Sequence, residues 1–195
     1  MNSMTGKVDR RVRKTRAQLR AGLARLMQKK NIREITVTEL VDEVDINRST
    51  FYLHYEDIYQ MLESIEQEIM EEIRLSVTST PIEPLASTDK AQAFLVHIFS
   101  YLEENREICN ALLGPHGDMA FVEQTEKLVA ETVFESLANQ FPKTTPDMKY
   151  TYSFCLTGLV GMLKSWLSAE EPESPRYMAD LTHKLFTNIT RDIIK

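Results

Sequence analysis

Residues 36–62, TVTELVDEVDINRSTFYLHYEDIYQML, contain two short helical patterns that are separated by a tight break. Thr36 and Glu39 form a capping-box pattern at the start of the first helix. Asn47 is a favourable N-cap for a second short helix over residues 48–54. In a helix-turn-helix the second helix lies in the DNA major groove and the first helix crosses the backbone. The stretch therefore predicts a DNA-binding motif.

The N-terminal face of the second helix offers Arg48, Ser49, Thr50 and Tyr52 to a DNA partner. Arginine can bind guanine through two hydrogen bonds, and threonine can touch a thymine methyl group or a phosphate. A short polar helix after a turn is also common in proteins that do not bind DNA. A basic N-terminal segment is equally often a solvated tail. Spacing and charge alone leave these alternatives open.

The charge of the chain is unevenly distributed. Residues 1–33 carry 11 Lys and Arg and one acid, whereas residues 34–60 carry one base and seven acids. The net charge of −6 over 195 residues hides this difference. The N-terminal segment, including Arg11 and Arg13, is therefore expected to attract an anionic partner without sequence preference.

Residues 11–65 resemble the DNA-binding segment of TetR/AcrR-type transcriptional regulators. Residues 47–57, NRSTFYLHYED, are similar to the family's recognition helix and its FYxHF continuation. The resemblance implies an all-α homodimer. Its three-helix helix-turn-helix domain would span residues 8–56, and a larger helical domain for ligand binding and dimerisation would span residues 57–195. The family usually acts by repression.

The resemblance also implies roles for single residues. Phosphate contacts are implied for Thr36, Thr38, Tyr52 and His54, and Arg48, Ser49 and Thr50 are implied to face the groove. Asn47, the N-cap, is also a candidate DNA-binding residue. Phe51 and Tyr55 are four residues apart and are expected in the core of the small domain. The family usually has glycine where this chain has Asp45, which tolerates a left-handed backbone better than most residues. The family often has a lysine at the start of the fourth helix, where this chain has Ile58.

The remaining chain predicts four further helices over residues 90–112, 119–140, 147–168 and 175–194. The basic N-terminal segment is expected to form the first helix of the chain, and Asn31 is expected to adopt a left-handed cap at its end.

The candidate lining of a pocket for an unknown small-molecule ligand consists of Met61, Ile65, Phe94, His97, Ile98, Tyr101, Cys109, Phe121 and Tyr152. Ordinary core packing is the alternative for each of these side chains.

The helix over residues 147–168 and the last helix are expected to form a four-helix dimer interface. Candidate interface residues are Gly158, Gly161, Leu163, Trp166, Leu181 and Leu185. Glycines inside a helix cost up to about 1 kcal/mol each, which close helix approach would explain. Packing within one chain is the alternative.

Other classes of function have weaker support. The chain has no Gly-rich phosphate loop, nucleophile elbow or His-Glu-x-x-His motif, so no catalytic residue, cofactor or metal site is predicted. Two cysteines make no disulfide framework, and no apolar stretch is long enough to span a bilayer, so a cytoplasmic protein is expected. The main alternative to an inducer-controlled operator-binding protein is a TetR-like co-regulator that acts mainly through a protein partner.

Overall fold

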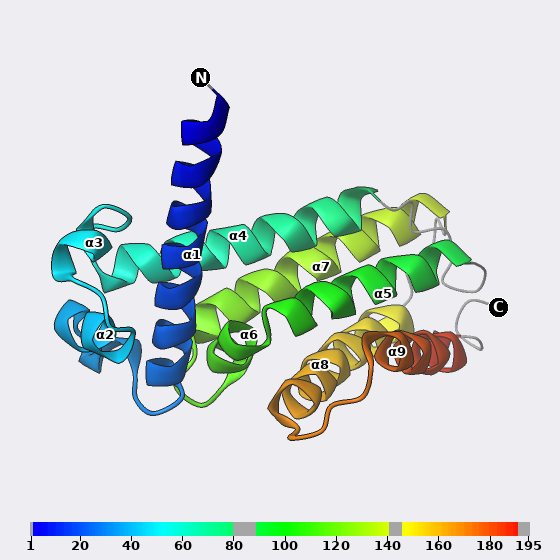
Figure 1. Ribbon diagram of the computed structural model, residues 1–195. Coiled ribbons are helices and arrows are strands. Elements are labelled where there is room, and N and C mark those ends of the chain that lie inside the picture. The colour runs from blue at the N-terminus through cyan, green and yellow to red at the C-terminus, as the bar shows by residue number, and fades with distance from the viewer. Residues whose placement is uncertain (1, 80–88, 141–145, 191–195) are drawn as a thin grey trace. The chain divides into compact units, whose positions relative to one another are not determined.

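The computed structural model describes residues 2–79, 89–140 and 146–190, and every regular element in these ranges is a helix. Figure 1 shows their arrangement. The predicted all-α class is confirmed. The elements are α1 (Asn2–Met27), the 3₁₀ helix η1 (Ile32–Glu34), α2 (Val37–Glu43), α3 (Arg48–Tyr52), α4 (Ile58–Ser79), α5 (Asp89–Glu104), α6 (Arg106–Leu113), α7 (Met119–Gln140), α8 (Pro146–Ser168) and α9 (Pro175–Thr190).

The chain divides into two compact units. Unit 1 contains residues Met1–Glu68 and Glu107–Met119, and unit 2 contains Ile69–Arg106 and Ala120–Lys195. The sequence placed the domain boundary at residues 56 and 57, whereas the division by contacts falls inside α4. The first 11 residues of α4 therefore pack with the helix-turn-helix, and the rest of α4 belongs to unit 2.

Unit 1 has an apolar core formed by α1, α2, α3 and the start of α4. Its fully or almost fully buried side chains include Leu19, Leu23, Leu40, Val41, Phe51, Tyr55, Met61 and Ile65. The expectation that Phe51 and Tyr55 lie in this core is confirmed. Their rings are 5.9 Å apart and tilted by 47°, which is a favourable aromatic geometry.

Local capping determines where the helices of unit 1 begin. The Glu39 N–H donates to Thr36 Oγ1 at 3.2 Å, and the Gln60 N–H donates to Asp57 Oδ1 at 2.8 Å. The Thr36 N-cap was predicted from the sequence. Asp45 has a φ of 53°, as expected for a residue that replaces glycine in this turn.

Two expectations about helix boundaries are wrong. Asn31 has an extended backbone with φ −66° and caps η1 through a reciprocal pair of bonds with Glu34 and Arg33, so it is not a left-handed cap of α1. The helix expected over residues 90–112 is two helices, α5 and α6, that are separated at Asn105. The Asn105 side chain donates to the Tyr101 carbonyl at 2.9 Å, which satisfies one of the last carbonyls of α5.

Unit 2 packs α9 against α5 and α8. The Trp166 ring is buried and meets Phe99 edge to face at 5.3 Å, and its indole N–H donates to the Glu173 carbonyl at 2.8 Å. Arg106 Nη2 donates to the carbonyls of Trp166 and Ala169 at 2.8 and 2.7 Å. These bonds satisfy carbonyls at the C-terminal end of α8 and fix the turn that leads to α9.

Substitutions at Asp45 will test the strain in the turn between α2 and α3. We expect Asp45→Gly to raise the free energy of unfolding by about 0.5–1 kcal/mol, because glycine accepts a positive φ and removes a carboxylate from a helix C-terminus. Asp45→Val should lower it by about 1–2 kcal/mol. Asp45→Asn keeps the shape of the side chain and removes its charge, so it separates the effect of the charge from that of the backbone conformation. Equal melting temperatures for the Gly and Val variants, at one protein concentration, would contradict the strained turn.

Candidate nucleic-acid interface

The short helix α3 separates its inward-facing and outward-facing residues clearly. Phe51 is fully buried, whereas Arg48 and Ser49 are exposed and Thr50 is half-buried. The three predicted groove-facing side chains therefore share the N-terminal end of one exposed helix. This is the end that contacts base edges in helix-turn-helix proteins.

Asn47 precedes α3 as its N-cap residue, but its side chain makes no capping hydrogen bond. The backbone alone begins the helix, since the Thr50 N–H donates to the Asn47 carbonyl at 2.9 Å. The exposed Asn47 amide is therefore not occupied by the helix end. A side-chain amide in this position can both donate to and accept from a base edge.

Tyr52 is the last residue of α3, and His54 lies in the turn that follows it. The Tyr52 side chain is 55% exposed and His54 is half-buried. Burial, followed by the charge of Arg16, lowers the pKa of His54 below its ordinary value. The lowered pKa favours the neutral imidazole, which offers one N–H donor without a positive charge.

Two exposed side chains beside α3 were not predicted to have a role. Leu53 is 81% exposed and Tyr59, in the first turn of α4, is 56% exposed. The available signal in the sequence was the apolar Ile58 at a position where the family often has lysine. Ile58 is buried in the structure, and its neighbour Tyr59 faces outward. Both are apolar or aromatic groups adjacent to the recognition helix, where contact with thymine methyl groups or sugars is possible chemistry.

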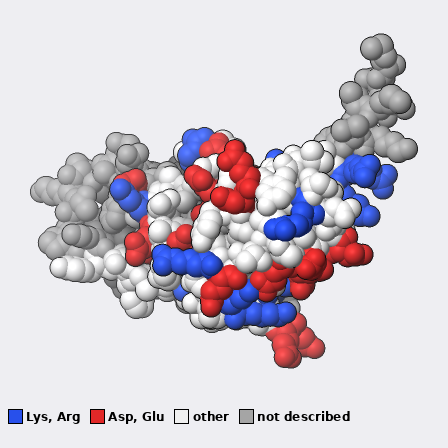
Figure 2. Space-filling model, turned by 90° about the vertical axis from the view of Figure 1, so that its left-hand side faces the viewer, with Lys and Arg blue, Asp and Glu red and all other residues white. Residues whose placement is uncertain are grey.

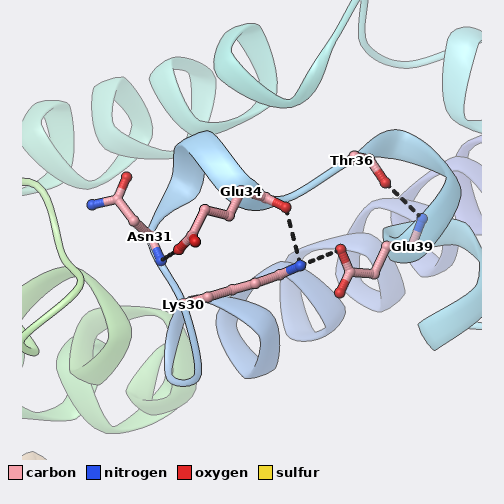
Figure 3. A network of polar contacts seen from close by, with 5 residues as sticks. All are labelled: Lys30, Asn31, Glu34, Thr36 and Glu39. Atoms are coloured by element: carbon pink, nitrogen blue, oxygen red, sulfur yellow. Dashed lines mark hydrogen bonds and ion pairs between the residues drawn. The ribbon is translucent and has the colours of Figure 1, made fainter.

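The acids between residues 34 and 60 are partly neutralised by cations near the C-terminal end of α1. Arg25 Nε donates to Glu43 Oε1 at 2.7 Å, and this hydrogen bond lowers the pKa of Glu43. Lys30 Nζ contacts Glu39 Oε2 at 2.5 Å and the Glu34 carbonyl at 3.0 Å (Figure 3). Figure 2, which faces the α2 and α3 side, shows basic and acidic groups interspersed over the surface.

Thr36 and Thr38 are exposed at the start of α2, next to this polar network. The Thr36 hydroxyl oxygen already accepts from Glu39 (Figure 3), so its hydroxyl proton remains available to an external acceptor. Arg11 and Arg13 are exposed on α1. Within unit 1, α2 and α3, which carry most of the predicted residues, are in contact with each other.

The candidate ligand-binding residues are divided between the two units. Met61, Ile65 and Cys109 are buried in unit 1, where they contribute to its core. Burial raises the pKa of the Cys109 thiol to about 11, so the thiol stays protonated. The remaining described candidates lie in unit 2: Phe94, His97, Ile98, Tyr101 and Phe121. The side chain of Tyr152 lies outside the described residues.

Within unit 2, His97 is engaged with a protein group. Its Nε2 lies 2.9 Å from Glu72 Oε1, and its side chain is exposed. A separate open groove of about 350 Å³ lies between α7 and α8 and contains none of the predicted ligand residues. Its lining is Glu123, Glu126, Lys127, Ala130, Ser153, Leu156 and Thr157.

The candidate interface residues on α8 divide between two faces. Gly158 and Gly161 are exposed, and a Cβ on either would have no neighbour within 4 Å. Trp166 is 4% exposed and packs inside its own unit, so the structure removes it from an interface with a second chain. At about 100° per residue, Leu163 lies on the same buried side as Trp166.

Three large exposed aromatic side chains on α8 and α9 were missed by the sequence reasoning, namely Tyr150, Phe154 and Tyr177. Tyr150 and Phe154 are 73% and 68% exposed, and helical spacing puts them on the glycine face of α8. On α9, Tyr177 and Leu185 are exposed and Leu181 is half-buried. The aromatic residues at steps of four were the available signal, but the sequence did not show which apolar face the chain itself covers.

Other kinds of site have no support in the described ranges. No three His, Cys, Asp or Glu side chains there are grouped so that they could hold a metal ion. In the same ranges, no helix has the length and apolar character needed to cross a bilayer.

Comparison with known proteins identifies the family. Residues 89–188 match the family model described as the TetR-type transcriptional regulator C-terminal region. The HTH-type transcriptional regulator YxbF of Bacillus subtilis (strain 168) is 35% identical over 97 residues, which are 48% of this chain and 26% of that protein. The chain therefore spans about a quarter of the length of this relative.

Solved structures show the same fold. A TetR transcriptional regulator from Streptococcus agalactiae matches with a TM-score of 0.54 and 21% identity, covering 93% of this chain and 98% of that one. The fatty acid degradation regulator FadR from Bacillus halodurans matches with a TM-score of 0.60 and 13% identity, covering 87% and 93%. Because the family model spans more than half of the sequence, the protein belongs to the TetR family of helix-turn-helix, DNA-binding transcriptional regulators, which are not enzymes.

Proposed function

We propose that this regulator is a homodimer that binds a palindromic operator and represses transcription until a small-molecule ligand releases it. The single observation that carries the proposal is the exposed N-terminal end of α3, where Asn47, Arg48 and Ser49 face outward from a buried Phe51. Direct base contacts require such side chains on a helix that is itself held rigidly.

Two copies are needed for a palindrome, and the surface of unit 2 supports an interface between copies. The stripe of Tyr150, Phe154, Gly158 and Gly161 on α8 is exposed in the single chain. Large aromatic groups beside glycines allow a second helix to approach closely and to bury apolar area. The exposed residues of α9, Tyr177 and Leu185, extend the apolar character to the neighbouring helix.

Helix α4 is the proposed route from ligand to DNA, because it begins beside the recognition helix and continues into unit 2. A ligand that favours one tilt of α4 would change the separation of the two recognition helices, which must match about 34–36 Å of DNA or a compatible longer step. A coupling of about 1–3 kcal/mol would change operator affinity about five- to 150-fold. Operator would weaken ligand binding by the same factor.

The function is tested by measuring binding to the DNA upstream of the protein's own gene and to random DNA of equal length. We expect selective binding at physiological salt, with an affinity that falls as salt rises. Equal affinity for the two duplexes would contradict the operator proposal. That result would favour the alternative, a co-regulator that acts mainly through a protein partner.

Arg48 provides a sharper test of base reading. We expect Arg48→Ala to weaken operator binding by about 1–3 kcal/mol if Arg48 contacts a base edge, and to relax the preference at one base pair. Arg74→Ala removes the same charge from an exposed position in unit 2 and is the matched control. If both variants lose the same amount of affinity in a titration, Arg48 does not read a base.

Gly161 separates the proposed dimer interface from folding. A leucine at Gly161 meets open space in the single chain and is a better helix former than glycine, so we expect helicity to be kept. The same side chain would block close approach of a second α8, and we expect at least a tenfold loss of dimer affinity in sedimentation. Gln124→Leu, on the exposed surface of α7, is the control. A Gly161→Leu variant that dimerises like the wild type would contradict this interface.

A further inference from the structure

Leu53, the residue that follows α3, extends an apolar side chain into solvent. It is 81% exposed, more than any other large apolar side chain in the part of the chain that the structure describes. A single exposed leucine is common on protein surfaces, so its type alone carries no meaning. Its position in unit 1 decides what it can contact.

The backbone of Leu53 continues the helical geometry of α3. Leu53 has φ −74° and ψ −14°, which lie in the right-handed helical region. At about 100° per residue, Leu53 and Ser49 each lie about 160° from the buried Phe51, and about 40° from each other. Leu53 therefore occupies the same outward face as Ser49, about 6 Å further along the helix axis.

Two buried aromatic side chains hold Leu53 in place from both sides. Phe51 is fully buried and Tyr55 is 6% exposed, and each lies two residues from Leu53. The Phe51 carbonyl accepts from the N–H groups of His54 and Tyr55 at 2.9 and 3.1 Å. The backbone that carries Leu53 is therefore anchored to the core, and its side chain leaves the unit from a fixed position.

The chemistry of Leu53 restricts what it can meet on DNA. A leucine side chain has no hydrogen-bond donor or acceptor, and it carries no charge. Contact with a phosphate, or with a base edge that needs a hydrogen bond, would leave a polar atom unpaired and weaken binding. A DNA partner must therefore present an apolar group beside Leu53 if the face of Ser49 is to enter the groove.

Duplex DNA has such a group in its major groove, the C5-methyl group of thymine. Apolar side chains read thymine through this methyl group, which the other three bases lack. An aliphatic side chain on the outward face of a recognition helix matches it in polarity and position.

We infer that Leu53 contacts the C5-methyl group of a thymine in the major groove and is a specificity-determining residue of the operator complex. This inference rests on the proposed operator binding, and it adds an apolar contact to the polar contacts of Arg48 and Ser49. The thymine lies within about two base pairs of the base edge that Ser49 faces, because 6 Å along α3 spans about two base-pair steps.

The test replaces thymines of the footprinted palindrome by deoxyuridine, one symmetric pair of positions at a time. The replacement removes the methyl group and keeps the O4 acceptor and the base pairing. For the wild type, we expect a loss of affinity of about fourfold per half-site at the position that Leu53 faces. A dimer that contacts both half-sites should lose about 15-fold.

The variant Leu53→Ala assigns this response to the leucine side chain. Its affinities for the thymine and deoxyuridine operators should differ by less than about twofold at that position, and its responses at other thymines should equal those of the wild type. Its salt dependence should also be unchanged, because no charge is altered. We expect the fold to be kept, since Leu53 is exposed and alanine is a good helix former.

Leu75→Ala is the matched control. It truncates another exposed leucine, on the part of α4 that belongs to unit 2, and should keep the full response to deoxyuridine. Equal responses of the wild type and Leu53→Ala at every thymine would overturn the methyl contact, even if Leu53→Ala binds more weakly, since a contact with a sugar does not distinguish the two bases. Selective operator binding in the same titrations would then leave the proposed function standing. Failure of the wild type to prefer its operator over random DNA would overturn the proposed function as well.

Discussion

The close approach of α1 and α2 at Gly22 is the constraint on which the DNA-facing surface depends. A Cβ at this position would clash with Val44 Cγ1 and lie 3.1 Å from Leu40 Cδ1, so only glycine allows the two helices to pack at this distance. The Arg25–Glu43 and Lys30–Glu39 pairs lie on the same α1–α2 connection. They are exposed or half-exposed pairs and add little stability, so the apolar contact holds α2 in place.

The recognition helix is in turn positioned from α2. Asp45 turns the chain with a φ of 53°, and Phe51 then enters the core at a fully buried position. A helix of five residues cannot be stable by itself, since helices that short do not repay the cost of nucleation. Its exposed face therefore exists because Phe51 and Tyr55 anchor its other side.

Local chemistry explains why this region was predictable. The caps at Thr36 and Asp57 and the turn at Asp45 depend on residues that are neighbours in the sequence. The faces of α8 were less predictable. Its apolar residues surround the helix, and periodicity did not show that Trp166 packs against Phe99 while Phe154 stays exposed. That outcome depends on tertiary contacts, which a single sequence does not display.

The pocket was hardest to predict for the same reason. Buried Met61 and Ile65 fit a ligand site and a core equally well by type and spacing, and the structure places them in the core of unit 1.

The break at Asn105 was also missed, because the apolar period continues through it from α5 into α6. An asparagine in mid-helix was a weak signal of the end of α5.

The same packing bears on the proposal that α4 transmits a change to the DNA-binding unit. The ion pair between Arg20 and Glu68 connects α1 to α4, but the Glu68 side chain is 50% exposed. A pair of this kind contributes at most about 1 kcal/mol and is weakened by salt. Met61 and Ile65 are each almost fully buried on α4, and moving either one out of contact costs about 1.5–3 kcal/mol. Apolar packing on α4 is therefore strong enough to carry a coupling of the size that the proposed induction requires, whereas the ion pair alone reaches only the lower end of that range.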